Sequence, residues 1–412
     1  MKGSIFDNLL ISEVGIVKLM EDLGEALNVN PNILFLGGGN PARIERFEQI
    51  VSDQLGAIVS NPDKLHKIIG VYQSPRGDEK FIDQLAGYLN RHCGWAVTNK
   101  NIAVTNGGQS TLFILINMLT NGSDQKLCFP IMPEYLGYSS QGLIDNFAVG
   151  LKPNIKEIGQ HFFKYQIDFQ ALAETNNIGA YCISVPTNPS GNVLALEDID
   201  RLTQIATSKG ARVIVDCAYG NPFPGIVYDQ SELAWDARRI YVFSLSKLGM
   251  PGLRCGIIVA EEETIDHFVT INTVINLANS NLGPIITSSL LQHNLLPQIC
   301  RDILLPFYRD QRDFTIAHIE KSLDGIPYRI HNPEGAFFLW LWLPELPITS
   351  MELYKRLKSK DVLVMPGEYF FFGIEQPWPH SRQCLRLTYC QSKKDIEKAI
   401  AILGQELKEL YQ

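Results

Sequence analysis

The sequence predicts an α/β fold, with a large domain built on a mostly parallel sheet and a smaller α+β domain beside it. Two observations predict this fold. Through the middle of the chain, short and continuously apolar runs alternate with longer amphipathic stretches, which is typical of parallel strands buried on both faces. At the ends the pattern differs, with one apolar run before residue 52 and four after residue 300. We therefore expect residues 53–299 to form the large domain, and residues 1–52 and 300–412 to form the smaller one together.

The expected elements follow from this pattern in chain order. Apolar runs bounded by turn residues favour strands, whereas stretches with apolar residues at helical spacing favour helices. In the large domain, strands are expected at 101–105, 125–130, 179–185, 211–216, 239–244 and 255–260, and helices at 109–119 and 198–209. In the smaller domain, strands are expected at 33–36, 328–330, 336–342, 362–365 and 384–389.

Composition excludes several classes of protein. Of 412 residues, 45% are hydrophobic and 19% are charged, so a disordered chain is excluded. The net charge of −8 argues against nucleic-acid binding, which needs clustered Lys and Arg. No apolar stretch reaches the roughly 20 residues of a membrane span, and the N-terminus does not resemble a secretory signal. The eight cysteines form no CxxC pair and the histidines show no metal-ligand spacing, so we expect a cytoplasmic protein without a metal.

Lys247 stands where an expected strand runs into a loop rich in Gly and Pro. Such a lysine is poorly solvated, and burial lowers the pKa of an amine. A neutral amine can attack a carbonyl group and form a Schiff base. Ser244 and Arg254 flank it in the sequence, and hydroxyl and guanidinium donors suit a phosphate. A surface lysine followed by a loop arginine would give the same pattern.

Asp216 ends the expected strand 211–216, and Tyr219 follows three residues later. Open α/β sheets bind their ligands beyond the carboxyl ends of the strands, where a carboxylate can accept a hydrogen bond from a protonated ring nitrogen. The alternative is that Asp216 caps a helix.

Two further loops follow expected strands. Asn188 lies in the rigid segment 186–192, which contains two prolines, and Gly108 with Gln109 lies in the Gly-rich turn before the helix 109–119. Backbone amides at a helix N-terminus bind phosphate. Each loop taken alone also fits an ordinary turn.

The order and spacing of these residues carry more information than any one of them. Asn188 precedes Asp216 by 28 residues, Lys247 follows Asp216 by 31, and Arg254 follows Lys247 by seven. In this the chain resembles the aspartate-aminotransferase-like family of fold-type-I pyridoxal-phosphate (PLP) enzymes, over nearly its whole length, from residues 37–41 to 386–389. The resemblance implies a seven-stranded sheet in the large domain.

The resemblance also implies roles around the PLP ring. Lys247 would hold the cofactor as a Schiff base and carry the proton between substrate and cofactor, and Asp216 would keep the pyridine nitrogen protonated. Asn188 and Tyr219 would hydrogen-bond the 3-oxygen of the ring. Tyr135 would stack on the ring.

The remaining implied roles concern the phosphate and the substrate. The phosphate would be held by Gly108, Gln109, Ser244 and Arg254. Tyr72 would reach the phosphate from the partner subunit, which implies a homodimer with shared active sites. Arg386 would grip the substrate α-carboxylate with its forked guanidinium, assisted by Asn188 and the backbone near Gly39.

Several motifs narrow the resemblance to the branch of the family that exchanges the amino group of valine with pyruvate, giving 3-methyl-2-oxobutanoate and L-alanine. They lie at residues 35–42, 244–256, 332–342 and 376–380. A small apolar substrate also agrees with the lack of an obvious second arginine for a side-chain carboxylate. Ile11, residues 14–17 and the aromatic run 369–372 are candidates to line the side-chain pocket, and ordinary core packing explains them equally well.

Four alternatives stay open at this stage. A transaminase with another amino-acid donor, or a lyase that uses the same cofactor, would keep Lys247 and Asp216. A transcription regulator with an aminotransferase-like domain needs a basic N-terminal module, and the motif at 37–41 begins too early to leave room for one. A degenerate binding protein would not need the whole set of residues.

Overall fold

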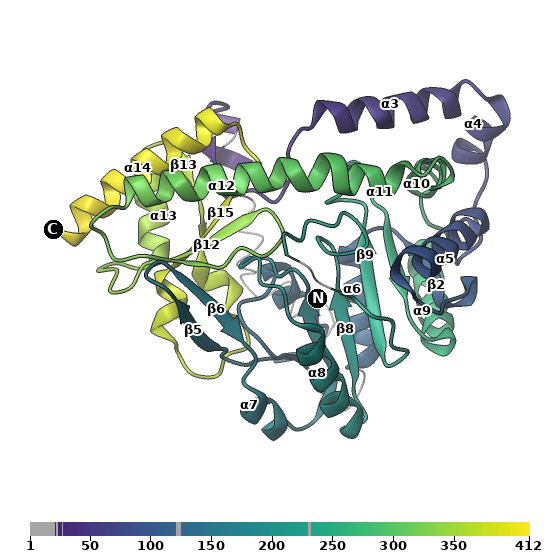
Figure 1. The fold of residues 1–412 in the computed structure, drawn as a ribbon. Helices are drawn as coiled ribbons and strands as arrows, with labels where there is room; N and C mark the ends of the chain where they lie inside the picture. Colours follow the sequence, from purple (N-terminus) through teal and green to yellow (C-terminus); the bar gives the residue numbers. More distant parts are fainter. Residues whose placement is uncertain (1–20, 22–23, 27, 121–124, 230–231) are drawn as a thin grey trace, which may run out of the picture.

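The computed structural model describes residues 21, 24–26, 28–120, 125–229 and 232–412 (Figure 1). Among these residues, seven strands form one sheet, the large sheet, in the order β2-β10-β9-β8-β7-β3-β4. β10 runs antiparallel to both neighbours, and the other neighbours pair in parallel. The predicted mostly parallel sheet is confirmed. Its strands are β2 (Ile102–Thr105), β3 (Lys126–Phe129), β4 (Ala148–Gly150), β7 (Ile178–Ser184), β8 (Arg212–Asp216), β9 (Arg239–Ser244) and β10 (Gly256–Val259).

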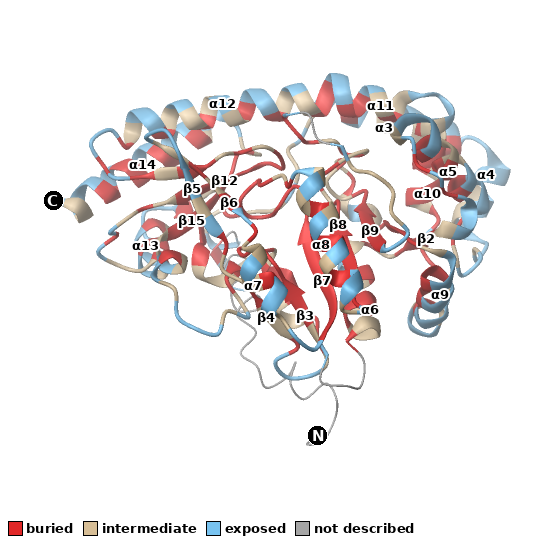
Figure 2. Cartoon of the chain, turned by 60° about the horizontal axis from the view of Figure 1, so that its bottom comes forward, coloured by how far each residue is buried: buried red, intermediate tan, exposed pale blue. Residues whose placement is uncertain are grey.

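Helices cover the large sheet, which is why its strands read as continuous apolar runs. Every residue of β7 and β9 is buried, and the strands stand out as the buried centre in Figure 2. One helix packs on β2, β9 and β10, and another on β8. These two are α6 (Gly108–Leu119) and α8 (Leu196–Ser208), and the other helices of this part are α5 (Glu79–Cys93), α7 (Phe169–Glu174), α9 (Glu262–Asn276) and α10 (Leu282–Gln292).

A second sheet, the small sheet, contains six strands among the described residues, in the order β14-β15-β12-β11-β6-β5. A separate strand pair joins residues before 36 to residues after 361, so both ends of the chain contribute here. The strands are β5 (Asn154–Ile158), β6 (Phe162–Gln166), β11 (Arg329–His331), β12 (Phe338–Trp342), β14 (Met365–Pro366) and β15 (Cys384–Thr388), with the pair β1 (Leu34–Phe35) and β13 (Val362–Leu363).

Four further helices lie in the C-terminal part of the chain. One of them, drawn in green in Figure 1, runs below α3 from the short helix beside α10 to the C-terminal helix, against which it packs. No helix in the described ranges is long and apolar enough to cross a membrane. The helices are α11 (Leu295–Ile299), α12 (Leu305–Ser322), α13 (Ser350–Lys358) and α14 (Lys393–Tyr411).

Two features differ from the expected pattern along the chain. The hairpin of β5 and β6 lies within residues 53–299 of the sequence, yet β6 pairs in parallel with β11 of the small sheet. In addition, α3 (Glu45–Val59) runs through the expected boundary at residue 52 and packs against α10, and α4 (Pro62–Ile69) follows it. We keep the division into 1–52, 53–299 and 300–412 as a proposal, with the hairpin assigned to the small sheet.

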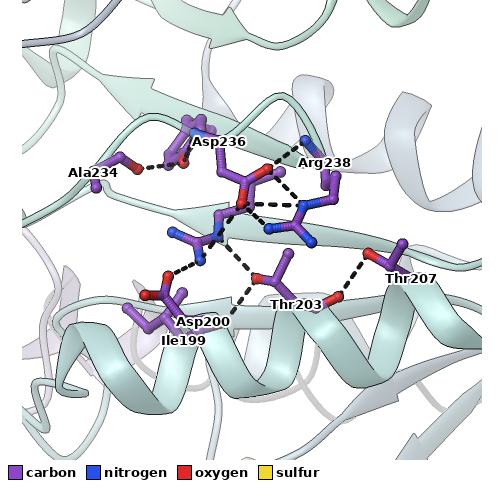
Figure 3. A network of polar contacts seen from close by, with 9 residues as sticks. Ile199, Asp200, Thr203, Thr207, Ala234, Asp236 and Arg238 are labelled. Atoms are coloured by element: carbon purple, nitrogen blue, oxygen red, sulfur yellow. Dashed lines mark hydrogen bonds and ion pairs between the residues drawn. The ribbon is translucent and has the colours of Figure 1, made fainter.

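A network of polar contacts, which includes Asp200, Thr203 and Asp236 (Figure 3), ties α8 to the amino end of β9. Arg239 is 1% exposed, and its Nε donates to Thr203 Oγ1 at 2.8 Å. It also pairs with Asp200 of the same helix, while the neighbouring Arg238 pairs with Asp236. Because Arg239 begins β9 and Ser244 ends it, this network fixes the strand at the end opposite to Lys247.

Candidate active site

The carboxyl ends of four strands meet at one edge of the large sheet. β7, β8 and β9 are parallel, and β2 has their direction because β2 and β9 both run antiparallel to β10. The residues that the sequence singled out lie at this edge. Asp216 ends β8 and Ser244 ends β9. The segments that follow the four strands carry the others: Gly108 and Gln109 after β2, Asn188 after β7, Tyr219 after β8 and Lys247 after β9. The edge is the expected place for a ligand site in an α/β sheet.

Lys247 points into this site. Its Nζ donates to the Gly39 carbonyl at 2.7 Å and lies 5.5 Å and 5.8 Å from the ring centroids of Tyr219 and Phe337. Burial lowers the pKa of the Lys247 ammonium to about 8, because the charged form loses solvation. Near neutral pH an appreciable fraction of the amine is therefore uncharged and nucleophilic.

Asp216 is 8% exposed and is held from two sides. Tyr138 Oη donates to its Oδ2 at 2.6 Å, and the amide of Ala218 donates to its Oδ1 at 2.9 Å. Burial raises the pKa of Asp216, while these two hydrogen bonds act in the opposite direction. The result is an oriented carboxylate at the floor of the site that can accept a hydrogen bond from a cationic N–H.

Arg386, on β15 of the small sheet, is 3% exposed and faces the same site. Its Nη1 donates to Asn188 Oδ1 at 2.8 Å, and its Nη2 donates to the Gly37 carbonyl at 2.7 Å. The guanidinium lies 4.2 Å from the ring centroid of Phe338 and 5.2 Å from that of Phe370.

The same arginine has unused hydrogen-bonding capacity. Its buried Nε has no hydrogen-bond partner among the described residues, and burial lowers the pKa of Arg386 to about 10. A buried cation with an unpaired donor is costly unless an anion meets it. A carboxylate fits, because its two oxygens match the guanidinium fork.

A second place suited to an anion lies at the amino end of α6. Gly107 caps this helix with φ +111°, and a side-chain carbon there would lie 2.5 Å from Arg254 Nη2. Because Gly107 has no side chain, the exposed guanidinium of Arg254 can lie against the backbone beside Gly108. Ser244 lies 5% exposed at the neighbouring strand end, and Gln109 is the second residue of the helix. Free helix amides with an arginine and a hydroxyl suit a phosphate group.

Two tyrosines border the space between these sites. The Tyr135 ring meets the Tyr138 ring edge-on, with centroids 5.2 Å apart. Tyr219 is 5% exposed and packs against Phe337 and Phe338, at 5.0 Å and 5.7 Å between centroids. Burial raises the pKa of both tyrosines, so both hydroxyls stay protonated and can donate hydrogen bonds.

Tyr72 is the predicted residue that the structure does not bring to this site. It follows α4 and is 82% exposed. Asn281, the residue before α10, donates to the carbonyls of Lys67 and Val71, so the Tyr72 segment lies beside the loop between α9 and α10. This segment exposes Ile69 and Val71, and the end of α9 exposes Val274, Ile275 and Leu277.

The comparisons with known proteins agree with this site. The model of the family "Aminotransferase class I and II" matches residues 55–403. The chain belongs to the class I and II aminotransferase family. The valine–pyruvate aminotransferase of Escherichia coli K12 is 38% identical to it, over 100% of this chain and 99% of that protein.

Two solved aminotransferases have nearly the same fold. The putative amino-acid aminotransferase from Psychrobacter arcticum superposes with a TM-score of 0.96, at 37% identity, over 100% of this chain and 99% of that one. The valine–pyruvate aminotransferase from Salmonella typhimurium superposes with a TM-score of 0.89, at 39% identity, over 96% of this chain and 99% of that one.

Sequence reasoning missed two residues of this aminotransferase that contact predicted site residues, Tyr138 and Glu134. Tyr138 lies three residues after Tyr135 in the turn η2 (Leu136–Ser140), a spacing that could have shown that both face one side. Of the lining candidates, Phe370 lies beside Arg386, whereas Phe371 packs on Trp340 and Phe372 on Phe129. Ile11 and residues 14–17 lie outside the described residues.

Proposed function

We propose that this aminotransferase binds PLP and exchanges the amino group between valine and pyruvate by a ping-pong reaction, giving 3-methyl-2-oxobutanoate and L-alanine. The observation that carries the proposal is the meeting of three groups at one sheet edge: the part-buried amine of Lys247, the buried carboxylate of Asp216 and the buried guanidinium of Arg386. The identity to an enzyme named for valine and pyruvate supports the choice of substrates.

The residues of the site fit PLP. The cradle of Gly107, Gly108 and Arg254 would hold the phosphate, with Ser244 and Gln109 beside it. Asp216 would accept a hydrogen bond from the ring nitrogen, which keeps that nitrogen protonated. Bound PLP supplies an aldehyde for an amine to attack and a ring that withdraws the electrons released at the substrate α-carbon.

The roles of the residues follow from their positions. Lys247 Nζ would hold the cofactor covalently and would carry the proton between the substrate α-carbon and the cofactor. A lowered pKa suits an amine that must act as a base near neutral pH. Asn188 and Tyr219 would donate hydrogen bonds to the ring oxygen, and Tyr135 would cover one face of the ring.

Arg386 would bind the α-carboxylate common to the amino acid and the keto acid, with Asn188 and the backbone around Gly39 as its neighbours. The guanidinium is flanked by the rings of Phe338 and Phe370, so a side chain that enters beside the carboxylate meets apolar surface. Apolar surface favours an aliphatic substrate such as valine over an acidic one.

We also propose a homodimer in which Tyr72 reaches the phosphate of the partner's site. The exposed position of Tyr72 and the apolar side chains around it support this, because large exposed apolar patches mark interaction surfaces. A cytoplasmic location stays a prediction; all eight cysteines lie among the described residues and are free thiols.

The experiment that tests the function is an amino-exchange assay with purified protein and added PLP. Formation of alanine and 3-methyl-2-oxobutanoate from valine and pyruvate would support the proposal. Exchange with another donor in place of valine would keep the reaction and refute the substrate. No exchange with any donor would refute the reaction itself.

A further inference from the structure

A fully buried carboxylate lies behind the site and takes no part in the steps above. Glu134 is 0% exposed and lies in the segment between β3 and η2. Its Oε1 accepts a hydrogen bond from the Ser184 amide at 2.9 Å, and its Oε2 accepts one from the Ser184 hydroxyl at 2.5 Å. Oε2 also accepts a hydrogen bond from the Tyr135 amide at 3.3 Å. All three donors are uncharged, so hydrogen bonds alone hold this carboxyl group among the residues that the structure describes.

These hydrogen bonds close a ring of contacts around the floor of the site. Ser184 ends β7 and stands opposite Asp216 on β8. Asp216 accepts the hydrogen bond of Tyr138, and the Tyr138 amide donates to the Tyr135 carbonyl at 3.0 Å. Glu134 completes the ring by joining Tyr135 to Ser184. Glu134 therefore links the segment that carries the Tyr135 ring to the ends of β7 and β8, where Asp216 lies.

The backbone of Glu134 adds a third link. Its amide donates to the carbonyl of Phe370 at 3.1 Å, and the Phe370 ring lies 5.2 Å from the guanidinium of Arg386. This hydrogen bond uses the backbone, so it survives a change of the Glu134 side chain. The side-chain contacts and the backbone contact can therefore be separated by mutation.

We propose that Glu134 is a positioning residue of the cofactor site, whose carboxylate holds the Tyr135 backbone against the end of β7 and so fixes the Tyr135 ring relative to Asp216. The proposal rests on the proposed function, since the groups that it positions are those expected to contact the PLP ring at its face and at its nitrogen. Glu134 itself does not reach the cofactor.

The electrostatics agree with this placement. Burial raises the pKa of Glu134 to about 8, the hydrogen bonds of Ser184 act against that shift, and the negative charge of Asp216 adds to it. Near neutral pH the Glu134 carboxyl group therefore carries a proton much of the time, and both of its oxygens keep lone pairs that accept the hydrogen bonds of Ser184 and Tyr135 in either form. Burial raises the pKa values of Tyr138 and Cys182, and the ionised form of Glu134 adds to both shifts. Glu134 therefore interacts electrostatically with Asp216, in addition to the chain of hydrogen bonds that links the two residues.

A change of Glu134 to glutamine isolates the side-chain contacts, because the two side chains have the same size. Both oxygens of the Glu134 carboxyl group can accept hydrogen bonds, whether or not one of them carries a proton, whereas an amide has one acceptor oxygen and an NH2 group that only donates. If the glutamine oxygen keeps the hydrogen bond from the Ser184 amide, the new NH2 group points at the Ser184 hydroxyl. The hydroxyl can accept a hydrogen bond, so this contact is kept with its direction reversed. The Tyr135 amide then faces a donor and loses its partner. The variant therefore releases Tyr135 while it keeps the end of β7.

The test compares wild-type protein, Glu134→Gln and a matched control, Glu406→Gln. Glu406 is also a buried carboxylate, 2% exposed, but lies on α14 and pairs with Arg356 and Lys360. For each protein we would measure the dissociation constant of PLP by titration of the apo-protein, the circular dichroism of the bound cofactor, and kcat and KM for the amino acid. Circular dichroism reports the orientation of the ring, which a purely structural role would leave unchanged.

The expected result for Glu134→Gln is PLP binding weakened by about tenfold, the factor for one buried hydrogen bond, with an altered cofactor dichroism and a lower kcat. KM should be unchanged, because Arg386 and Asn188 keep their contacts, and Glu406→Gln should match the wild type in affinity and dichroism. Wild-type affinity and dichroism in Glu134→Gln would overturn the inference. If Glu134→Gln did not fold, Ser184→Ala would be measured instead. PLP binding should then be weakened by a smaller factor, and wild-type affinity and dichroism in Ser184→Ala would overturn the inference. A wild-type protein that bound no PLP would instead refute the proposed function.

Discussion

Arg386 Nη1 donates a hydrogen bond of 2.8 Å to Asn188 Oδ1, and this contact joins the two sheets at the active site. Arg386 lies on β15 of the small sheet, and Asn188 lies in the loop that follows β7 of the large sheet. The contact brings a buried cation to the edge where Lys247 and Asp216 lie. The carboxylate site therefore depends on how the small sheet sits against the large one.

Arg386→Ala should raise KM for both the amino acid and the keto acid. Loss of a buried, hydrogen-bonded charge partner costs on the order of 2–5 kcal/mol, and both substrates carry the carboxylate that Arg386 would bind. Steady-state kinetics with each substrate varied in turn measure this. Arg329→Ala is the control, because Arg329 pairs with Glu157 on the far strands of the small sheet. Two unchanged KM values would exclude Arg386 as the anchor.

Tyr138→Phe should lower kcat by about tenfold, the effect of one hydrogen bond to a charged group. The Tyr138 hydrogen bond lowers the pKa of Asp216, so its loss moves that pKa upward and leaves Asp216 less able to keep a ring nitrogen protonated. Tyr411→Phe is the control, because the Tyr411 hydroxyl donates to the Pro344 carbonyl, away from the site. An unchanged kcat in Tyr138→Phe would show that this bond does not support catalysis.

The rate at which the apo-protein captures PLP should rise with pH and level off above about 8, where burial places the pKa of Lys247. Only the neutral amine attacks the aldehyde. If Lys247 had the usual pKa of 10.5, the rate of PLP capture would keep rising well above pH 8. Stopped-flow absorbance over a pH series measures the midpoint. Lys247→Ala should form no bond that borohydride can reduce, and a midpoint near the usual value would contradict the assigned burial.

The same shift affects stability. An amine whose pKa is lowered in the folded state binds fewer protons there than in the unfolded state, so stability rises with pH between the two pKa values. Relative to Lys247→Ala, the wild-type apo-protein should therefore gain stability as the pH increases from about 8 toward 10.5. Urea unfolding of both proteins at several pH values measures the difference, and a difference that does not depend on pH would contradict the shift.

Shared active sites can be tested with two defective variants. Tyr72→Ala should weaken PLP binding and Lys247→Ala should abolish covalent capture, but each defect lies in a different part of the proposed composite site. A hybrid dimer made by co-expression should regain one intact site, with both defects placed in the other. If Tyr72 acts within its own chain, the hybrid should gain no activity beyond that of the separate variants.

The sequence predicted six of the seven strands of the large sheet, because burial on both faces leaves a direct mark, a continuous apolar run. The missed strand, β4, is only partly buried. The hairpin of β5 and β6 leaves no such mark. β5 is mostly exposed and contains Asn154, Lys156 and Glu157, and its place in the small sheet is set by the pairing of β6 with β11, which lies more than 160 residues later. Such long-range pairing is not visible in local periodicity.

The same contrast holds for the site. Asp216, Asn188 and Lys247 could be predicted to meet because the carboxyl ends of parallel strands share one edge. Arg386 lies on another sheet, so only the family resemblance indicated it. Glu134 and Tyr138 act through hydrogen bonds to Ser184 and Asp216, and these partners become evident only in the folded chain.

The most direct test of the central claim is the absorbance spectrum of the protein with bound PLP, recorded before and after addition of valine and then of pyruvate. We predict that valine removes the visible band of the cofactor and releases 3-methyl-2-oxobutanoate, because this half-reaction leaves the amino group on the cofactor. Pyruvate should then take the amino group away, restore the band and release alanine. A band that is present but unaffected by valine, while another amino acid removes it, would contradict the assigned substrate.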